Sequence, residues 1–180
     1  MPIIIAGLLA AAGCSQPVTS DRDPPGGQFH VYFNNDSLTE GHTVCDAVFP
    51  VLRSSPEPID EPSAALEALF PGPTPEERAQ GYRSFFSART AGLLKHLKIE
   101  SGTAYLDLRD KRTELAGITS SCGSAEFFSQ IQHTLGEYPE IQRIIFAIEG
   151  NPGVFYDWLE LECDQSNDDC DPAPFALPSD

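Results

Sequence analysis

The chain has few basic residues, and this shortage excludes two classes of partner. Its 180 residues include 11 Lys and Arg against 27 Asp and Glu, which gives a formal net charge of −16 and an isoelectric point near 4.4. Binding to a phosphate backbone requires clustered Lys and Arg, and no basic stripe occurs along the sequence. The same deficit excludes attraction to anionic lipid headgroups. We therefore expect no nucleic-acid partner, and any membrane attachment has to come from an apolar segment or a lipid.

The sequence also lacks the motifs of common catalytic and cofactor sites. It contains no glycine-rich phosphate loop, no serine nucleophile elbow and no zinc-type histidine cluster, and its four histidines are scattered. We therefore predict that the protein is not an enzyme and that it uses no cofactor and no metal.

Cys122 is the strongest candidate for a nucleophile, because "SCGSAEFF" places its thiol at a predicted helix N-terminus. The nearest histidine along that helix is His133, eleven residues further on. Eleven residues correspond to about 16 Å along the axis at 1.5 Å per residue, so His133 cannot act on this thiol within the helix. A role for Cys122 in a disulfide is therefore favoured over a catalytic role.

The acidic segment 163–171, "CDQSNDDCD", has some features of a calcium loop. Asp164, Ser166 and Asp168 fall at alternating positions, as hard-ligand side chains often do. However, the sixth position holds Asp169 where a glycine is expected, and the twelfth holds Phe175 where a glutamate is expected. A solvated acidic loop is the favoured interpretation.

No apolar run is long enough to span a bilayer, but one near the start has the length of a signal-peptide core. This run, "PIIIAGLLAAAG", ends in small residues immediately before Cys14, a pattern that resembles the lipobox of bacterial lipoproteins. In such proteins the cysteine thiol receives a diacylglycerol and becomes the mature N-terminus. We predict a lipoprotein signal peptide over 1–13 and lipidation at Cys14. An ordinary cleaved signal, or a buried apolar segment with an incidental cysteine, is the alternative.

The segment that follows, residues 14–27, is polar, rich in proline and glycine, and without periodicity. Such a composition is typical of a flexible tether. A tether between a lipid and a folded domain predicts an extracytoplasmic protein held at the membrane by its N-terminus.

Four further cysteines remain in the part of the chain that follows Cys14, and they are Cys45, Cys122, Cys163 and Cys170. An even number of cysteines in an exported chain favours two disulfides, for which three pairings exist. Cys163 and Cys170 are close in sequence within a polar loop and form the favoured local pair, so Cys45 with Cys122 follows by elimination. Free buried thiols are the alternative.

Local sequence patterns predict an α+β fold in a single small domain over residues 28–162. The predicted strands are 29–33, 44–54 with Pro50 favouring an edge or a bulge, a hairpin of 93–100 with 103–108, a central strand 141–150 and a last strand 154–162. The predicted helices are 63–70, 74–81 and 124–138. We expect one mixed sheet of about four to six strands with two or three helices packed on it. The tail 163–180 is acidic and proline-rich, and we expect little order in it beyond a disulfide.

The order of these segments resembles the GerMN domain of sporulation and spore-germination proteins and of related bacterial lipoproteins. The stretches that carry the resemblance are "VYF", "LEALFPGPTPEE", "GTAYLDL" and "HTLGEYPEIQRIIFAIEG", which together span roughly residues 29 to 150. The resemblance implies an envelope protein, often lipid-anchored, that binds other proteins and has a fold similar to ring-building modules. It implies no catalytic residues.

Two functions follow as hypotheses. The first is a non-enzymatic, lipid-anchored module that docks onto an envelope protein partner, with self-assembly as a possible extension. The alternative is an extracytoplasmic protein that binds a small ligand or a cell-wall glycan on its sheet. Asp107 and Asp110 follow a predicted strand and could contribute to such a site, although acids at a strand end are usually just solvated.

Overall fold

The computed structural model describes residues 27–40, 42, 44–55, 60–164 and 168–176, and it confirms the α+β class. The strands are β1 Gln28–Asn35, β2 Val48–Ser54, β3 Tyr82–Arg83, β4 Leu94–Glu100, β5 Thr103–Leu108 and β6 Arg143–Ile148. The α-helices are α1 Glu61–Leu69, α2 Pro75–Ala79, α3 Ser121–Leu135 and α4 Pro152–Trp158. Short 3-10 turns occupy Asp36–Leu38, Ala116–Thr119 and Ala173–Phe175.

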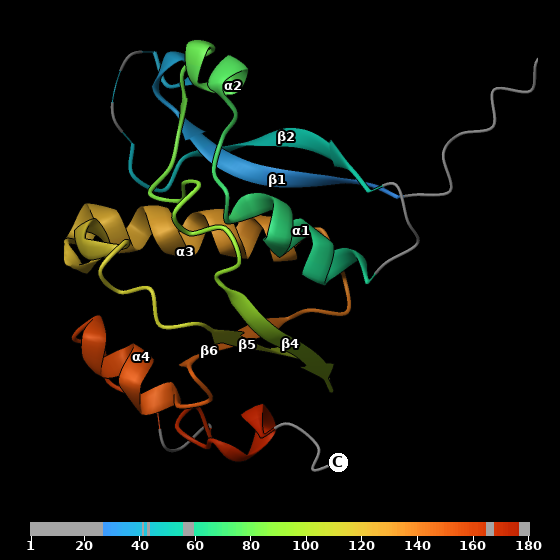
Figure 1. Ribbon diagram of the computed structural model, residues 1–180, viewed down its shortest axis with the longest axis vertical. Coiled ribbons are helices and arrows are strands. Elements are labelled where there is room, and N and C mark those ends of the chain that lie inside the picture. The colour runs from blue at the N-terminus through green and yellow to red at the C-terminus, as the bar shows by residue number, and fades with distance from the viewer. Residues whose placement is uncertain (1–26, 41, 43, 56–59, 165–167, 177–180) are drawn as a thin grey trace, which may run out of the picture.

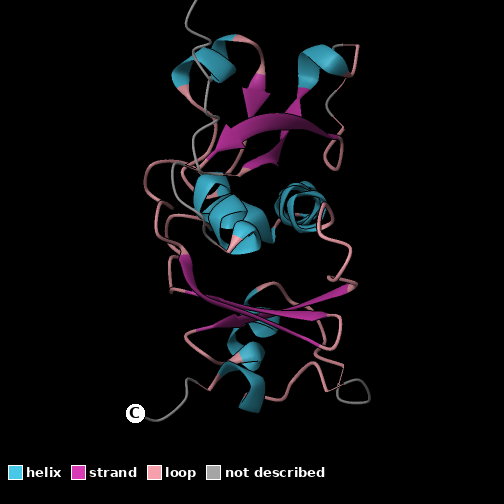
Figure 2. Cartoon of the chain, turned by 90° about the vertical axis from the view of Figure 1, so that its right-hand side faces the viewer, coloured by secondary structure: helices cyan, strands magenta, loops and turns pink. Residues whose placement is uncertain are grey.

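The strands form two separate three-stranded sheets, and helices α1 and α3 lie between them (Figures 1 and 2). The order in the first sheet is β2–β1–β3, and the order in the second is β4–β5–β6. We expected one mixed sheet. The division has a physical reason in α3, which is buried on two sides: Thr134 contacts β1, whereas Phe128 packs against Phe146 of β6. A helix with two buried sides needs a packing partner on each of them, and here each of the two sides meets a sheet.

In the first sheet, β1 is central and turns Phe29, Val31 and Phe33 into the core. β2 is an edge strand, as Pro50 predicted, since proline lacks the N–H that a second neighbour would require. β3 pairs with β1 only at Asn34 and Asn35. Within the part of the chain that the structure describes, the first six residues of β1 therefore have a strand neighbour on one side only.

In the second sheet, the predicted hairpin is confirmed. Ser101 and Gly102 connect β4 to β5 with φ of 50° and 84°, the positive values that a tight hairpin turn needs at both central residues. β5 and β6 are parallel, and α3 lies in the connection that parallel pairing requires. β6 was expected to be central, but it is an edge strand. Its unbroken apolar run reflects burial of both faces and says nothing about how many strands flank it.

The helix signals near the middle of the chain are also confirmed. Thr74 accepts a hydrogen bond from the Glu77 N–H at 3.2 Å, and Glu77 in return accepts one from the Thr74 N–H at 2.8 Å, which completes the predicted capping box at α2. The helix predicted over 124–138 begins and ends three residues earlier, with Ser120 as its N-cap. Tyr138 therefore lies in the turn that follows α3.

The strand predicted over 154–162 is wrong, because this segment forms helix α4. Asn151 caps the helix by accepting the Val154 N–H at 3.3 Å, and Pro152 occupies the first turn, where its missing N–H costs nothing. Phe155 then stacks on Phe146 of β6 with ring centroids 4.8 Å apart. Of the aromatic residues that favoured a strand, Phe155 is buried, and Tyr156 and Trp158 pack half-buried against the core from this helix.

The tail is more ordered than its composition predicted. Phe175 is 4% exposed and packs on the outer face of the second sheet, against Tyr105, Ile145 and Ala147. Asp169 forms an ion pair with Arg143 at the start of β6. Residues 165–167 and 177–180 of this tail lie outside the described residues.

Candidate binding groove

The predicted signal peptide, most of the tether and Cys14 itself lie outside the described residues. Within the described part of the chain, no helix has both the length and the apolar character that crossing a membrane would require. The lipidation of Cys14 therefore stays a prediction.

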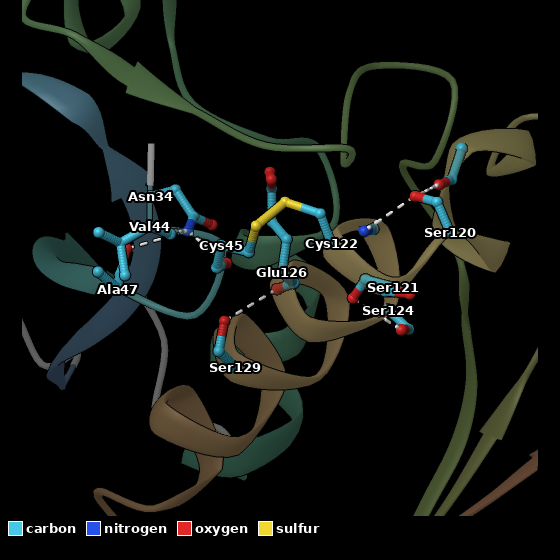
Figure 3. Close-up of a disulfide and its surroundings, with 12 residues drawn as sticks. Asn34, Val44, Cys45, Ala47, Ser120, Ser121, Cys122, Ser124, Glu126 and Ser129 are labelled. Carbon is cyan, nitrogen blue, oxygen red and sulfur yellow. Dashed lines mark hydrogen bonds between the residues drawn. A yellow bond between two sulfur atoms is a disulfide. The ribbon is translucent and has the colours of Figure 1, made fainter. Parts of the chain in front are cut away.

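The structure joins the four remaining cysteines in the pairs that the sequence favoured. Cys45 is bonded to Cys122 with Cα atoms 5.2 Å apart, and Cys163 is bonded to Cys170 with Cα atoms 5.5 Å apart. Cys122 lies in the first turn of α3, as predicted, but its sulfur is engaged in the disulfide (Figure 3). The ring of His133 lies 5.5 Å from the ring of Tyr32 near the opposite end of α3.

A buried polar network holds the Cys45 loop against α3. The side-chain amide of Asn34 donates to the carbonyl oxygens of Cys45 and Ala47 at 2.8 and 2.9 Å, and its oxygen accepts from Gln130 at 2.7 Å (Figure 3 shows the Asn34 contacts). Gln130 in turn accepts the hydroxyl hydrogen of Ser84 at 2.6 Å. Because buried amides are costly unless paired, this arrangement fixes the loop after β1 and supports the disulfide.

Next to that network, Glu126 and Arg83 form an ion pair, and Arg83 also contacts Asp36 at 3.0 Å. Burial raises the pKa of Glu126, and the charge of Arg83 opposes that shift only in part. Figure 3 shows the Glu126 side chain beside the disulfide. The carboxylate is thus committed to a cation of its own chain, which indicates a structural role.

Asp107 and Asp110, the two acids predicted as candidates for a ligand site, pair with different basic residues of the chain. Asp107 is buried, lies 3.2 Å from the ammonium of Lys95 and accepts the Gly150 N–H at 2.7 Å. Asp110 is exposed and pairs with Arg112 at 2.7 Å. Among the described residues, no group of three or more His, Cys, Asp or Glu side chains is arranged to hold a metal ion.

A groove lies beside the free edge of β1, where the first strand approaches the turn that follows α3. Its volume is about 470 Å³, within the range of ligand-binding clefts. Its lining residues are Gln28, Phe29, His30, Glu61, Glu137, Tyr138, Pro139 and Glu140. We call this the β1 groove. Three separate parts of the chain therefore meet at one concave, strongly acidic site.

Glu137 connects the two walls of the β1 groove. Its carboxylate accepts a hydrogen bond from the Tyr32 hydroxyl and lies 3.5 Å from Nδ1 of His30. These contacts lower the pKa of Glu137, the hydrogen bond from Tyr32 contributing most. Burial, together with the bond to Glu137, raises the pKa of Tyr32 to about 12. The tyrosine therefore stays a hydrogen-bond donor and the carboxylate stays charged at neutral pH.

Tyr138 forms part of the groove and carries a polar atom without a partner. The residue is 9% exposed, and its hydroxyl oxygen is buried without a hydrogen bond in the described structure. Burial, followed by the charges of nearby carboxylates, raises its pKa to about 12. Those carboxylates belong to Glu61, Glu137, Asp60 and Glu140. The hydroxyl group thus lies in a strongly negative environment and has no hydrogen-bond partner among the described residues.

These four carboxylates have no Lys or Arg partner among the described residues, although other acids of the chain do. Arg53 pairs with Glu77, for example, and Lys95 pairs with both Asp107 and Glu149. The nearest cationic candidate in the groove is His30, which contacts Glu137 alone. Among the described residues, no Lys or Arg therefore compensates the negative charge of the β1 groove.

Sequence analysis did not single out the residues of this groove. The predicted helix 124–138 contains Glu137 and Tyr138, and Glu140 follows shortly after it, so one acid lies on each side of Tyr138 and Pro139. A cluster of acids around a tyrosine at a helix exit is a weak signal. The acids around Tyr138 become a candidate site because His30 and Glu61, which are distant in sequence, line the same groove.

A second hollow lies on the other side of the end of α3, towards β6. It has a volume of about 400 Å³ and is lined by Gln132, Gly136, Ile141, Gln142, Arg143 and Ile144. Its polar side chains are amides and a guanidinium, so it differs from the β1 groove in charge. Arg143 there is already paired with Asp169.

The fold is that of a single small α+β domain, and comparison with known proteins gives its family. The model of the Germane family, described as "Sporulation and spore germination", matches residues 30–154, which is most of the chain. The chain therefore belongs to the Germane family. Membership supports a role in sporulation or spore germination.

Two solved structures are similar to the chain. The first GerMN domain of the sporulation protein GerM from Bacillus subtilis matches at 20% identity and a TM-score of 0.42, covering 69% of this chain and 84% of that one. The tandem GerMN domains of the same protein match at 19% identity and a TM-score of 0.42, covering 69% of this chain and 40% of that one. No curated protein matches the chain.

Proposed function

We propose that this protein is an extracytoplasmic adaptor, lipid-anchored at Cys14, that binds another protein of the cell envelope and catalyses no reaction. Family membership supports an envelope process such as sporulation or germination. The observation that carries the proposal is the β1 groove, where Glu61, Glu137 and Glu140 line the site and Asp60 lies near Tyr138. None of the four has a Lys or Arg partner among the described residues, and they lie beside a strand edge that no described strand pairs with. Uncompensated charge at a concave site favours a partner of opposite charge.

The location rests on two features. The pattern before Cys14 resembles a lipobox, and two disulfides are typical of proteins in oxidising compartments. Intact-mass spectrometry of the protein extracted from its native membrane tests both together. We expect a chain that begins at Cys14, carries acyl mass there and has its other four cysteines oxidised. A chain with an unmodified Cys14 and five reduced thiols would overturn this part of the proposal.

The partner is tested by cross-linking in detergent-solubilised native envelopes, with the full chain as bait. We expect the same protein to be recovered in each preparation and its association to slow as salt rises, because the groove is acidic. The proposal would be contradicted if no partner were recovered reproducibly, or if the association rate did not change with salt concentration.

The alternative function, binding of a small ligand or cell-wall glycan, would use the hollow between α3 and β6. Its amide and guanidinium groups from Gln132, Gln142 and Arg143 are suited to hydroxyl and carboxylate groups. Screening the full chain against soluble cell-wall fragments tests this function. The alternative would be favoured over the adaptor if a cell-wall fragment bound saturably, if Gln142→Ala abolished that binding, and if cross-linking recovered no envelope partner.

A further inference from the structure

We propose that the β1 groove receives an extended, basic segment of the partner protein, which pairs with the free edge of β1 and inserts an arginine or lysine side chain among the carboxylates. This inference rests on the proposed function, since it names the chemistry of the partner. The argument combines three observations: an unpaired strand edge, uncompensated negative charge and a buried hydroxyl group without a hydrogen bond.

The first observation is the strand edge. The backbone N–H of Tyr32 points away from β2, because it donates to the Thr134 hydroxyl at 3.1 Å. Alternate residues of a strand direct their N–H and C=O groups to the same side, so Gln28 and His30 direct theirs to the side where the groove lies. No strand of the described structure pairs with them there, since β3 begins to pair only at Asn34. An added strand could therefore satisfy these groups.

The second observation is charge. Four carboxylates surround the groove without a Lys or Arg from the described chain, as shown above. A guanidinium group offers five N–H donors, and carboxylates are acceptors only, so an arginine side chain could contact more than one of them at once. A lysine would supply a point charge with three donors.

The third observation is Tyr138. Its hydroxyl group is buried at the groove without a partner, and a buried polar group left unpaired costs free energy. An incoming cationic side chain would donate to the hydroxyl oxygen and so remove that cost. The unpaired hydroxyl group of Tyr138 therefore indicates a site that can accept a hydrogen bond from a ligand, which an acidic surface alone would not indicate.

The same observations disfavour other occupants. A metal ion would need a cluster of ligands that the described residues do not form. A second copy of this chain would also carry a net charge of −16, so the acidic groove would repel it. A free polyamine or amino sugar could neutralise the carboxylates, but it could not pair with the backbone of β1. Only a peptide segment uses both features.

The test uses the full chain, labelled with ¹⁵N and kept in detergent, and four probes. The main probe is a capped pentapeptide of sequence TRVRT, which can add as a strand and presents both arginines to one face. The second, TEVET, reverses the charge, and the third, TRPRT, removes the central N–H donor. The fourth probe is spermidine, a cation without a peptide backbone. We expect TRVRT to shift the amide signals of Gln28, His30 and Tyr138 in a saturable way and to bind more tightly than the other three.

Charge variants then identify the site. Glu61→Gln with Glu140→Gln should weaken TRVRT binding about fivefold, which is the upper range for an exposed ion pair. The matched control, Glu67→Gln with Glu162→Gln, removes the same charge from exposed positions outside the groove and should leave the affinity unchanged. Tyr138→Phe should also weaken binding while keeping the ring. Unchanged circular dichroism and melting temperature would show that a loss of binding does not reflect unfolding.

Each contrary result has a defined meaning. Equal binding of TRVRT and TRPRT would overturn strand pairing, and equal binding of spermidine would show that any small cation suffices. Absence of TRVRT binding, or equal binding by the groove and control variants, would overturn the assignment of this site. If the native partner binds wild-type and groove variants equally, the adaptor function stands and this inference falls. If the peptide binds as expected but no native partner is recovered, the inference about the groove stands and the adaptor function falls.

Discussion

The hydroxyl group of Thr134 on α3 accepts a hydrogen bond from the backbone N–H of Tyr32 on β1 at 3.1 Å. The contact places a helix where a neighbouring strand would otherwise pair, between the short β3 ladder and the β1 groove. An open edge is a hazard in a β-sheet, because it can pair with any extended chain. Here the helix covers part of the edge and leaves only the beginning of the strand available.

Replacing Thr134 with Val should destabilise the protein by about 1–2 kcal/mol, because the N–H of Tyr32 loses its acceptor while the size of the side chain is kept. Urea denaturation followed by circular dichroism measures the change in the free energy of unfolding. Thr134→Ser keeps the hydroxyl group and serves as the control for the hydrogen bond. If the Val and Ser variants were equally stable, the contact would contribute nothing.

The pair of Glu77 and Arg53 should make stability depend on pH. Burial would raise the pKa of Glu77, but hydrogen bonds from Arg53 and the Thr74 N–H outweigh burial and hold it below its usual value. A pKa that is lower in the folded state contributes stability above the unfolded pKa, and the contribution disappears as pH falls through the folded value. Glu77→Gln should thus cost about 1 kcal/mol at pH 7, and the difference from wild type should shrink in acid.

The measurement for this pair is urea denaturation of wild type and variant at neutral and acidic pH. Glu76→Gln is a matched control, because it removes an exposed carboxylate from the same turn of α2. A Glu77→Gln effect of equal size at both pH values would show that the ion pair is not its cause.

Tyrosine ionisation should report on Tyr32 and Tyr138 at the groove, and burial also raises the pKa of Tyr156 in α4. The pKa values of Tyr32 and Tyr138 are both raised to about 12, mainly by burial and then by neighbouring carboxylates. The unfolded chain loses these protons near pH 10, so the protein should lose stability as pH rises from 10 towards 12. In an ultraviolet titration of the folded protein, Tyr32→Phe and Tyr138→Phe should each remove one tyrosine from the late step. A single transition of all tyrosines near pH 10 would contradict this.

Tyr138→Phe should also increase the stability of the free protein at neutral pH. The variant removes a buried hydroxyl group that has no partner, and such a group costs about 1 kcal/mol or more. Thermal denaturation without any ligand measures the change. A loss of stability instead would show that the hydroxyl group is satisfied in solution, and it would weaken the assignment of Tyr138 to ligand binding.

The two disulfides should contribute unequally. Cys45 and Cys122 are 77 residues apart, whereas Cys163 and Cys170 are separated by 7, and the loss of chain entropy in the unfolded state grows with the size of the closed loop. Replacing both cysteines by Ala should cost about 4 kcal/mol for the first pair and about 2 kcal/mol for the second. Guanidinium denaturation of the two double variants gives the comparison. Equal losses would point to strain or residual structure as the dominant effect.

Sequence patterns predicted the elements whose signals are local. The hairpin turn at Ser101 and Gly102, the capping box of α2 and the apolar stripe of α3 each lie within a few consecutive residues. Helix α4 was missed because its aromatic residues suit a strand as well as a buried helix, and the deciding signal was the cap at Asn151. Periodicity describes which faces are buried, and it cannot by itself separate these two cases.

The division into two sheets and the β1 groove could not be predicted in the same way. β3 has only two residues, Tyr82 and Arg83, too few for a pattern. The groove combines residues near 28–30, 61 and 137–140, and no single stretch shows that they meet. These residues lie close together because α3 packs between the two sheets. No local motif of the sequence predicts that packing.

The β1 groove begins at Gln28, the first residue of the first strand, so it lies next to the point where the chain enters the domain. A pulling force between a bound partner and an anchor at Cys14 would cross only the few residues that separate the groove from that entry point. The load would enter the domain through β1 of the first sheet, and the second sheet and the disulfide between Cys163 and Cys170 would remain outside the load path. Such an adaptor could hold its partner under tension without its second sheet being pulled open.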